Sequence, residues 1–228
     1  MYERSEPFQV INPADDTPGR GIFVFGAPRG GTSMVAGALR ILGVDMGERQ
    51  GHGNNEDLDI QDARGPAGEL SDPAGDALVS ALERMIPIIE SRAKVETSWG
   101  WKDPHGVYYA PQIEPLLPDP RIIVAFRDPL AAAQRVHMLT GLPLLEALED
   151  TLNLYQRCQR YLAETRLPAA IVSYEKSLVR PERFIDKLIA FCGLDPSDAA
   201  IEEAVAFCYP ERGHGSPKDP GWPRQGAL

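Results

Sequence analysis

Residues 22–33 read IFVFGAPRGGTS, a short apolar run that leads into a glycine-rich loop. The first four residues are typical of a buried strand, and the pattern at 32–43 predicts a helix. At such a turn, unpaired backbone N–H groups and the helix dipole together form a site for an anion. Gly30 and Gly31 let the backbone approach a phosphate without a side-chain clash. The stretch is thus either a phosphate-binding loop or a plain glycine-rich turn in which Thr32 caps the helix.

The loop nearly matches the nucleotide-binding pattern G-x-x-x-x-G-K-[ST], but it departs from that pattern at one position. Gly26, Gly31 and Ser33 have the required spacing, whereas Thr32 stands where the phosphate-gripping lysine belongs. The nearest cation is Arg29, inside the loop. A kinase needs its lysine after the last glycine, beside a magnesium ion, and no strand ends in an aspartate suited to hold that ion. The stretch alone is therefore a kinase loop that has lost its lysine, a plain glycine-rich turn, or a loop for a different phosphate ligand.

The rest of the chain alternates between strand-like and helix-like patterns. Further apolar runs predict strands at 122–126 and 170–174, with a shorter candidate at 98–101. Helical periodicity is found at 75–94, 142–165 and 181–192. This alternation predicts an α/β fold with a central, mainly parallel β-sheet flanked by helices. Ligands of such sheets bind outside the carboxyl ends of the strands.

The 228 residues are enough for one large domain with a sizeable core. Residues 1–20 are polar and contain several Pro, Gly and Asp, so we expect a flexible N-terminal lead-in. We assign 21–208 to the domain itself. Residues 209–228 are rich in Gly and Pro and predict a loop or flexible end.

Charge and cysteine content limit the possible partners and compartment. The net charge of −10 argues against general binding of nucleic acid or an anionic membrane, although a few arginines can still attract a small anion locally. No apolar run approaches the roughly 20 residues that span a bilayer, and the N-terminus does not resemble a signal peptide. The three cysteines lack C-x-x-C spacing. We therefore expect reduced, buried thiols and a cytoplasmic protein.

A second stretch, IIVAFRDPLAAAQR at 122–135, carries a cation at the end of a strand. Asp128 and Pro129 are typical of a helix cap and the first helical residue. A plain strand-to-helix junction explains these two residues but not Arg127, a permanent cation at the end of a buried strand. Such an arginine suits a phosphate or a sulfate.

Together the two stretches resemble the sulfotransferases that use phosphoadenosine phosphosulfate (PAPS). Their P-[KR]-x-G-T-[TS] loop is similar to Pro28, Arg29, Gly30, Gly31, Thr32 and Ser33, and their R-[DN]-P motif is similar to Arg127, Asp128 and Pro129. Three weaker stretches agree with bacterial members: GHGNNEDLDI (51–60), WGWKDP (99–104) and IVSYEKSLVRPERFIDKLIAFCGL (171–194). The resemblance extends from about residue 21 to 194 and implies the sulfotransferase version of the P-loop nucleotide-hydrolase-like fold.

The resemblance implies how the co-substrate is bound. The loop 28–33 would hold the 5′-phosphate end of PAPS, and Arg127 would hold the 3′-phosphate. The serine that the family usually places eight residues after this arginine is Arg135 here, which either binds the phosphate itself or is exposed to water. Tyr174 resembles the tyrosine of the adenine region, and its alternative is a core tyrosine. No metal is expected.

The resemblance also implies catalytic roles. Arg29 and Lys102 would stabilise the charge that develops on the departing phosphate, unless Lys102 is a solvated lysine beside a turn. Glu56 is the first candidate for the general base, and His105 is the second. The alternative for Glu56 is an ordinary surface carboxylate of an acidic protein.

The predicted activity is transfer of a sulfuryl group from PAPS to a hydroxyl of a small molecule or carbohydrate, with release of the product PAP. The alternatives are a kinase or nucleotide hydrolase with an altered loop, and a non-catalytic phosphonucleotide-binding domain. The sequence contains no motif that identifies the acceptor or the oligomeric state.

Overall fold

The structure is a computed structural model of the chain, and it describes all residues except 1–5, 15–16, 48, 50–54, 72–74 and 210–228. Most of the C-terminal segment predicted at 209–228 therefore lies outside the described residues. The strands are β1 (Phe8–Asn12), β2 (Gly21–Gly26), β3 (Trp99–Lys102), β4 (Pro120–Phe126) and β5 (Ala169–Ser173). The α-helices are α1 (Thr32–Ile41), α2 (Leu58–Arg64), α3 (Asp76–Arg92), α4 (Ala110–Ile113), α5 (Pro129–Thr140), α6 (Leu144–Glu164), α7 (Tyr174–Val179), α8 (Pro181–Cys192) and α9 (Asp198–Phe207). Short 3₁₀ helices are η2 (Ala67–Ser71), η3 (Gly106–Tyr108) and η4 (Glu114–Leu116).

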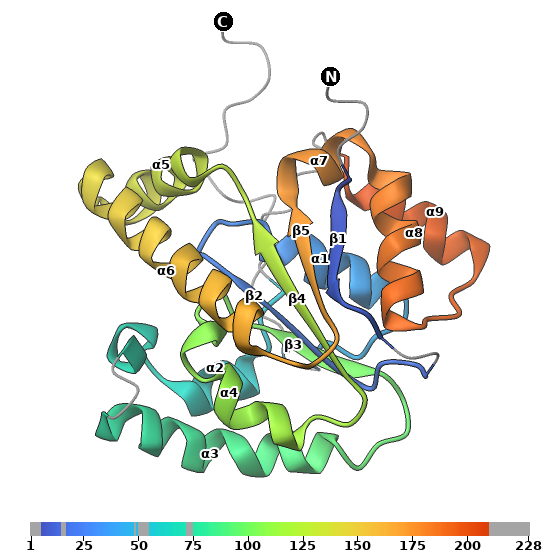
Figure 1. Cartoon of the computed structure of the whole chain (residues 1–228), viewed down its shortest axis with the longest axis horizontal. Coiled ribbons are helices and arrows are strands. Elements are labelled where there is room, and N and C mark those ends of the chain that lie inside the picture. Colours follow the sequence, from blue (N-terminus) through green and yellow to red (C-terminus); the bar gives the residue numbers. More distant parts are fainter. Residues whose placement is uncertain (1–5, 15–16, 48, 50–54, 72–74, 210–228) are drawn as a thin grey trace, which may run out of the picture.

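The strands form a five-stranded sheet in the order β1-β5-β4-β2-β3 (Figure 1). β2 pairs in parallel with both β3 and β4, and β4 pairs in parallel with β5. β1 is antiparallel to β5. The predicted α/β fold with a mainly parallel sheet and flanking helices is thus confirmed.

Two hydrophobic cores cover the two faces of the sheet because successive side chains of a strand point to opposite faces. Phe23 and Phe25 of β2 pack with α3, α4 and α6 on one face. Ile22 and Val24 pack with α1, α8 and α9 on the other. Figure 1 shows these two groups of helices on opposite sides of the sheet. β2 is buried along its whole length, as expected for a central parallel strand.

The prediction of a flexible lead-in over 1–20 is wrong for β1. Phe8 pairs with Val172 of β5, and its ring lies 5.4 Å from that of Phe191. Phe8 is the one buried residue of Phe8–Asn12, and Gln9, Val10 and Ile11 are exposed, so the sequence has no alternating pattern that would predict a strand. An edge strand needs a partner strand only on one side, and this partner lies more than 150 residues away along the chain.

Arg121 links the segment before β2 to the end of α8. It is the second residue of β4 and is 1% exposed. Its Nε donates to the carbonyl of Phe191 at 2.9 Å, and other guanidinium nitrogens donate to the carbonyls of Pro120 and Thr17. These carbonyl groups accept hydrogen bonds from a buried cation, as buried polar groups require.

Two further expectations concern the thiols and the membrane. Cys158, Cys192 and Cys208 are buried and unpaired, as predicted. Burial raises the pKa of each thiol to about 12, so the thiols are protonated at neutral pH. Within the described ranges, no helix combines the length and apolarity that crossing a bilayer requires.

Candidate active site

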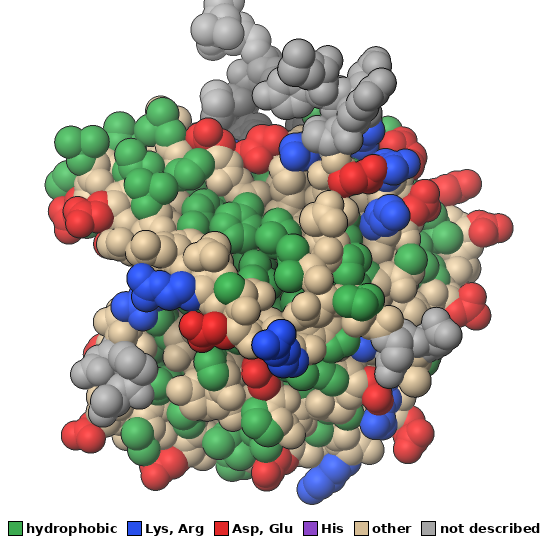
Figure 2. All heavy atoms as spheres, in the orientation of Figure 1, with side chains coloured by type: hydrophobic (Ala, Val, Ile, Leu, Met, Phe, Trp, Pro, Cys, Tyr) green, Lys and Arg blue, Asp and Glu red, His purple; other side chains and the backbone are tan. Residues whose placement is uncertain are grey.

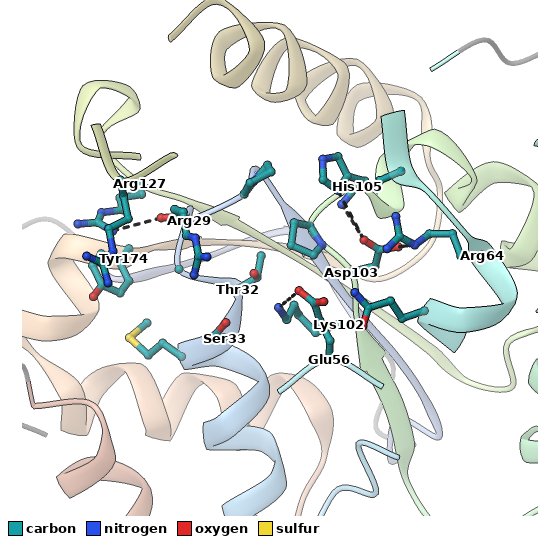
Figure 3. A pocket seen from close by; sticks show the side chains of 17 residues that line it. Arg29, Thr32, Ser33, Glu56, Arg64, Lys102, Asp103, His105, Arg127 and Tyr174 are labelled. Atoms are coloured by element: carbon teal, nitrogen blue, oxygen red, sulfur yellow. Dashed lines mark hydrogen bonds and ion pairs between the residues drawn. The ribbon is translucent and has the colours of Figure 1, made fainter. Parts of the chain in front are cut away.

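A cavity of about 280 Å³ lies at the carboxyl ends of the parallel strands, where α/β sheets bind ligands. It is bounded by the glycine-rich loop after β2, the segment before α2, the end of β3, and the starts of α5 and α7. Every functional position predicted from the sequence, apart from Gly30 inside the loop, lines this cavity: Pro28, Arg29, Gly31, Thr32, Ser33, Glu56, Lys102, His105, Arg127, Arg135 and Tyr174 (Figure 3).

The conformation of the loop at 27–31 requires glycine at two positions. Gly31 has a φ of 94°, and a Cβ added there would lie 2.6 Å from Cδ2 of Tyr174. A Cβ at Gly30 would lie 2.7 Å from the carbonyl oxygen of Ala27. Gly31 is the N-cap of α1 and Thr32 is its first residue, so Thr32 does not cap the helix. The N-terminus of α1 therefore faces the cavity with no side-chain cap in the way.

Arg29 extends from the loop in a strained conformation. Its φ of 62° lies in the left-handed region, which a non-glycine residue rarely occupies. Such strain is retained where the surrounding structure demands it, and it is concentrated at functional sites. Figure 3 shows the guanidinium between the Arg127–Tyr174 end and the Lys102–Glu56 end of the cavity.

Arg127 forms one end of the cavity together with Tyr174. Its guanidinium lies 4.7 Å from the centre of the Tyr174 ring, and Nη1 donates to the carbonyl of Arg29 at 3.2 Å. Among the described residues its buried Nε has no hydrogen-bond acceptor, and the carboxylate of Glu175, its ion-pair partner, lies 3.8 Å away. A buried guanidinium nitrogen of this kind is suited to an anion supplied by a ligand.

The helix cap predicted after Arg127 is confirmed. The Asp128 carboxylate accepts the N–H of Ala131 at 2.7 Å, and Pro129 is the first residue of α5. Arg135, two turns further along α5, lines the same cavity. Burial raises the pKa of Tyr174, and the charges of Arg127 and Arg135 oppose that shift. Tyr174 itself opens α7 directly after β5.

Tyr155 is a residue of this end that sequence analysis missed. Its hydroxyl accepts the backbone N–H of Arg127 at 2.9 Å, and its ring lies 4.7 Å from that of Phe126. A Cβ at Gly30 would lie 3.0 Å from the same hydroxyl. Tyr155 belongs to the apolar stripe of α6, and that pattern carries no signal for a polar contact with the end of β4.

Buried Lys102 and partly buried Glu56 form an ion pair in the middle of the cavity. Lys102 ends β3 and is 3% exposed, and its Nζ lies 2.6 Å from Oε1 of Glu56. Burial lowers the pKa of Lys102, and the Glu56 carboxylate opposes that shift. The preceding Asn55 donates to the carbonyl of Ser33 at 3.0 Å, which ties this segment to the start of α1. Lys102 and Glu56 are therefore not solvated surface groups, which was the alternative interpretation of each residue.

The other end of the cavity holds a network around Asp103 (Figure 3). Oδ1 accepts the backbone N–H of His105 at 2.9 Å, and Oδ2 accepts the hydroxyl of Tyr109 at 2.8 Å. Arg64, at the end of α2, places Nε 3.0 Å from Oδ2. Burial lowers the pKa of His105 below its ordinary 6.5, and Asp103 counteracts this shift in part. The imidazole is therefore neutral at neutral pH.

Arg64 was also missed by sequence analysis. It is 7% exposed, lines the cavity, and leaves Nη1 without a hydrogen-bond partner among the described residues. The sequence shows only an arginine in the last turn of a short helix, which is ordinarily a solvated position. Within the part of the chain that the structure describes, no cluster of His, Cys, Asp and Glu could hold a metal ion.

A glycine-rich loop at a helix N-terminus, with cations from neighbouring strand ends around it, defines an α/β protein that binds a phosphorylated ligand. The family model described as the sulfotransferase family matches residues 44–198, which is more than half of the chain. The chain belongs to the sulfotransferase family, and the predicted resemblance is confirmed. The match begins after the glycine-rich loop and includes these candidate residues: Glu56, Lys102, His105, Arg127, Arg135 and Tyr174.

Solved sulfotransferases share the fold. Sulfotransferase STF9 from Mycobacterium avium superposes with a TM-score of 0.53 at 15% identity, over 83% of this chain and 67% of its own. A sulfotransferase from Alicyclobacillus acidocaldarius gives 0.52 at 16% identity, over 84% and 92%. Mouse sulfotransferase SULT7A1, solved in complex with PAP, gives 0.52 at 14% identity, over 88% and 68%. At these identities the likeness concerns the fold. No curated protein matches the chain by sequence.

Proposed function

We propose that the protein transfers the sulfuryl group of PAPS to a hydroxyl of a small molecule or carbohydrate and releases PAP. One observation carries this proposal: basic side chains from separate segments surround the glycine-rich loop in one cavity of a chain whose net charge is −10. These side chains are Arg29, Lys102, Arg127 and Arg135. Such a concentration of cations suits a ligand with several anionic groups.

The two ends of the cavity suit the two ends of PAPS. The loop and the N-terminus of α1 would bind the 5′-phosphate, with hydroxyl donors from Thr32 and Ser33. Arg127 would bind the 3′-phosphate through its buried Nε, with Arg135 in place of the family's usual serine. The ring of Tyr174 offers a flat surface for the adenine.

In the proposed reaction an acceptor oxygen attacks the sulfur in line. A new S–O bond forms, the bond between the sulfur and the bridging oxygen breaks, and the electron pair leaves on the 5′-phosphate of PAP. Arg29 and Lys102 would stabilise that developing charge, at about 2.7–4 kcal/mol for each positioned donor. The acceptor's proton goes to a general base.

The geometry favours His105 over Glu56 as this base. His105 also lines the larger cavity next to the nucleotide site, and its pKa is lowered, so a neutral imidazole is available there. Glu56 is paired with the ammonium of Lys102 at 2.6 Å, which suits a role in orienting that lysine. We therefore propose His105 as the base and Glu56 as a positioning residue. The unpaired thiols fit a reducing compartment, and we propose a cytoplasmic enzyme.

The test is a comparison of thermal shifts with PAP, AMP and magnesium-ATP, followed by transfer of ³⁵S from labelled PAPS to hydroxyl compounds. A ligand at 100 times its dissociation constant stabilises the protein by about 2.7 kcal/mol. PAP is expected to stabilise the protein more than AMP, because only PAP carries the 3′-phosphate. Stronger stabilisation by magnesium-ATP would favour a kinase instead. PAP binding without transfer to any acceptor would favour a non-catalytic nucleotide-binding domain.

A further inference from the structure

A second cavity, of about 810 Å³, adjoins the nucleotide site and is large enough for an organic ligand of drug size. The two cavities share Pro28, Arg29, Ala67 and His105. A molecule in the second cavity therefore reaches the position where sulfuryl transfer is proposed.

The walls of the second cavity differ in polarity. Val136 and Leu139 of α5 and Leu154 of α6 contribute apolar surface. The cavity also exposes a polar row along α6, spaced by three or four residues so that it lies on one face of the helix: Asp150, Asn153, Arg157 and Arg160. Figure 2 shows Lys and Arg side chains gathered where this face is hollowed beside α6.

The two arginines of this row are available to a ligand. The guanidinium of Arg157 lies 5.2 Å from the centre of the Tyr108 ring, which orients it without neutralising its charge. Among the described residues, neither Arg157 nor Arg160 has a carboxylate within the 4.0 Å of an ion pair. By contrast, two other exposed arginines are paired with carboxylates, Arg49 with Asp59 and Arg183 with Glu6.

We propose that the acceptor is a hydroxyl compound that also carries an anionic group, a carboxylate or a sulfate, which Arg157 and Arg160 bind. A guanidinium matches the planar, bidentate geometry of such a group. The net charge of −10 repels anions from the protein in general. The two unneutralised arginines therefore attract an anionic ligand to this cavity in particular. Asn153 and Asp150 can bind further hydroxyls of the same acceptor. This inference rests on the proposed function, since it identifies the substrate class of the same site.

The test uses pairs of probes in which one member has a carboxylate and the other has a neutral group in its place. One pair is 4-nitrophenyl β-D-glucuronide and 4-nitrophenyl β-D-glucoside, and another is 4-hydroxyphenylacetate and its amide. Binding to the full chain saturated with PAP is measured by calorimetry, and ³⁵S transfer from PAPS is measured for each probe. In at least one pair the anionic member is expected to bind about tenfold more tightly, the effect of one charge-assisted contact.

The variant Arg157→Ala/Arg160→Ala is expected to reduce this preference to about one while leaving PAP affinity unchanged, because neither residue lines the nucleotide cavity. Arg166→Ala is the matched control, since Arg166 is an exposed arginine that follows α6 and lines neither cavity. The inference is overturned if no anionic member binds more tightly than its neutral partner, including the case in which no probe binds. A preference that survives in the double variant overturns it as well. Failure of PAP to bind the unaltered protein would instead refute the proposed function.

Discussion

Replacing Arg127 by alanine removes one cation from the nucleotide cavity and leaves the backbone around it supported. The hydrogen bond between the Arg127 N–H and the Tyr155 hydroxyl, at 2.9 Å, uses the main chain and survives the substitution. The side chain is 25% exposed. Among the described residues it makes one hydrogen bond, to the carbonyl of Arg29 at 3.2 Å, and one ion pair, with Glu175 at 3.8 Å. The substitution therefore tests ligand binding more than folding.

The expected loss follows from the contact that is removed. A hydrogen bond to a charged group contributes about 1.5–3 kcal/mol, so PAP affinity should fall about 10- to 150-fold. AMP lacks the 3′-phosphate, and its affinity should change by less than about threefold. Arg127→Lys keeps the charge but loses the bidentate geometry, and an intermediate loss is expected.

Calorimetric titration of each variant with PAP and with AMP measures the two dissociation constants, and Arg166→Ala is the control for a general change in charge. Thermal unfolding without ligand shows whether the fold is retained. Equal losses for PAP and AMP would mean that Arg127 has a structural role. Unchanged PAP affinity would refute the assignment of this end of the cavity to the 3′-phosphate.

Three further predictions follow from the described contacts. His105→Ala should lower kcat about 10²–10⁴-fold, whereas Glu56→Gln should leave PAP affinity nearly intact and cost less in turnover; the reverse result in steady-state kinetics would make Glu56 the base. In the pH–rate profile, the acidic limb of kcat/KM should lie below pH 6.5, because burial lowers the pKa of His105. The imidazole accepts a proton only when it is neutral, so the rate is lost as pH falls through that pKa. An acidic limb above pH 6.5 contradicts this assignment. Arg121→Met should reduce the free energy of unfolding by about 3 kcal/mol in urea titrations, because buried carbonyls lose their donor; a change under about 0.5 kcal/mol would show that those carbonyls find other partners.

Local patterns were sufficient for the parts of the fold that depend on neighbouring residues. The run before Gly26 predicts a strand and the glycines after it predict a tight turn, because both depend on local backbone freedom and side-chain periodicity. Asp128 and Pro129 likewise predict the start of α5, since a cap is a contact across three residues. The parallel order of the strands places the predicted residues at one edge, which is why they meet in one cavity.

Other features depend on contacts between distant segments, which periodicity does not encode. Lys102 and Glu56 are 46 residues apart, and only the packing of β3 beside the segment before α2 makes them an ion pair in which the lysine is buried. Tyr155 supports Arg127 because α6 crosses the end of β4, although its sequence position shows only a core tyrosine. The antiparallel pairing of β1 with β5 also joins opposite ends of the chain.

The sequence by itself determined the alternation of strands and helices, the glycine-rich loop and the cations near it along the chain, because local sterics and side-chain periodicity govern the backbone there. Only the tertiary structure decided which of these groups are buried and paired. It placed Asp103 between Arg64 and His105, and it made His105 common to the nucleotide cavity and the larger cavity beside it. Burial and charge pairing depend on segments that meet only when the sheet is formed, and they are what shift the pKa of His105.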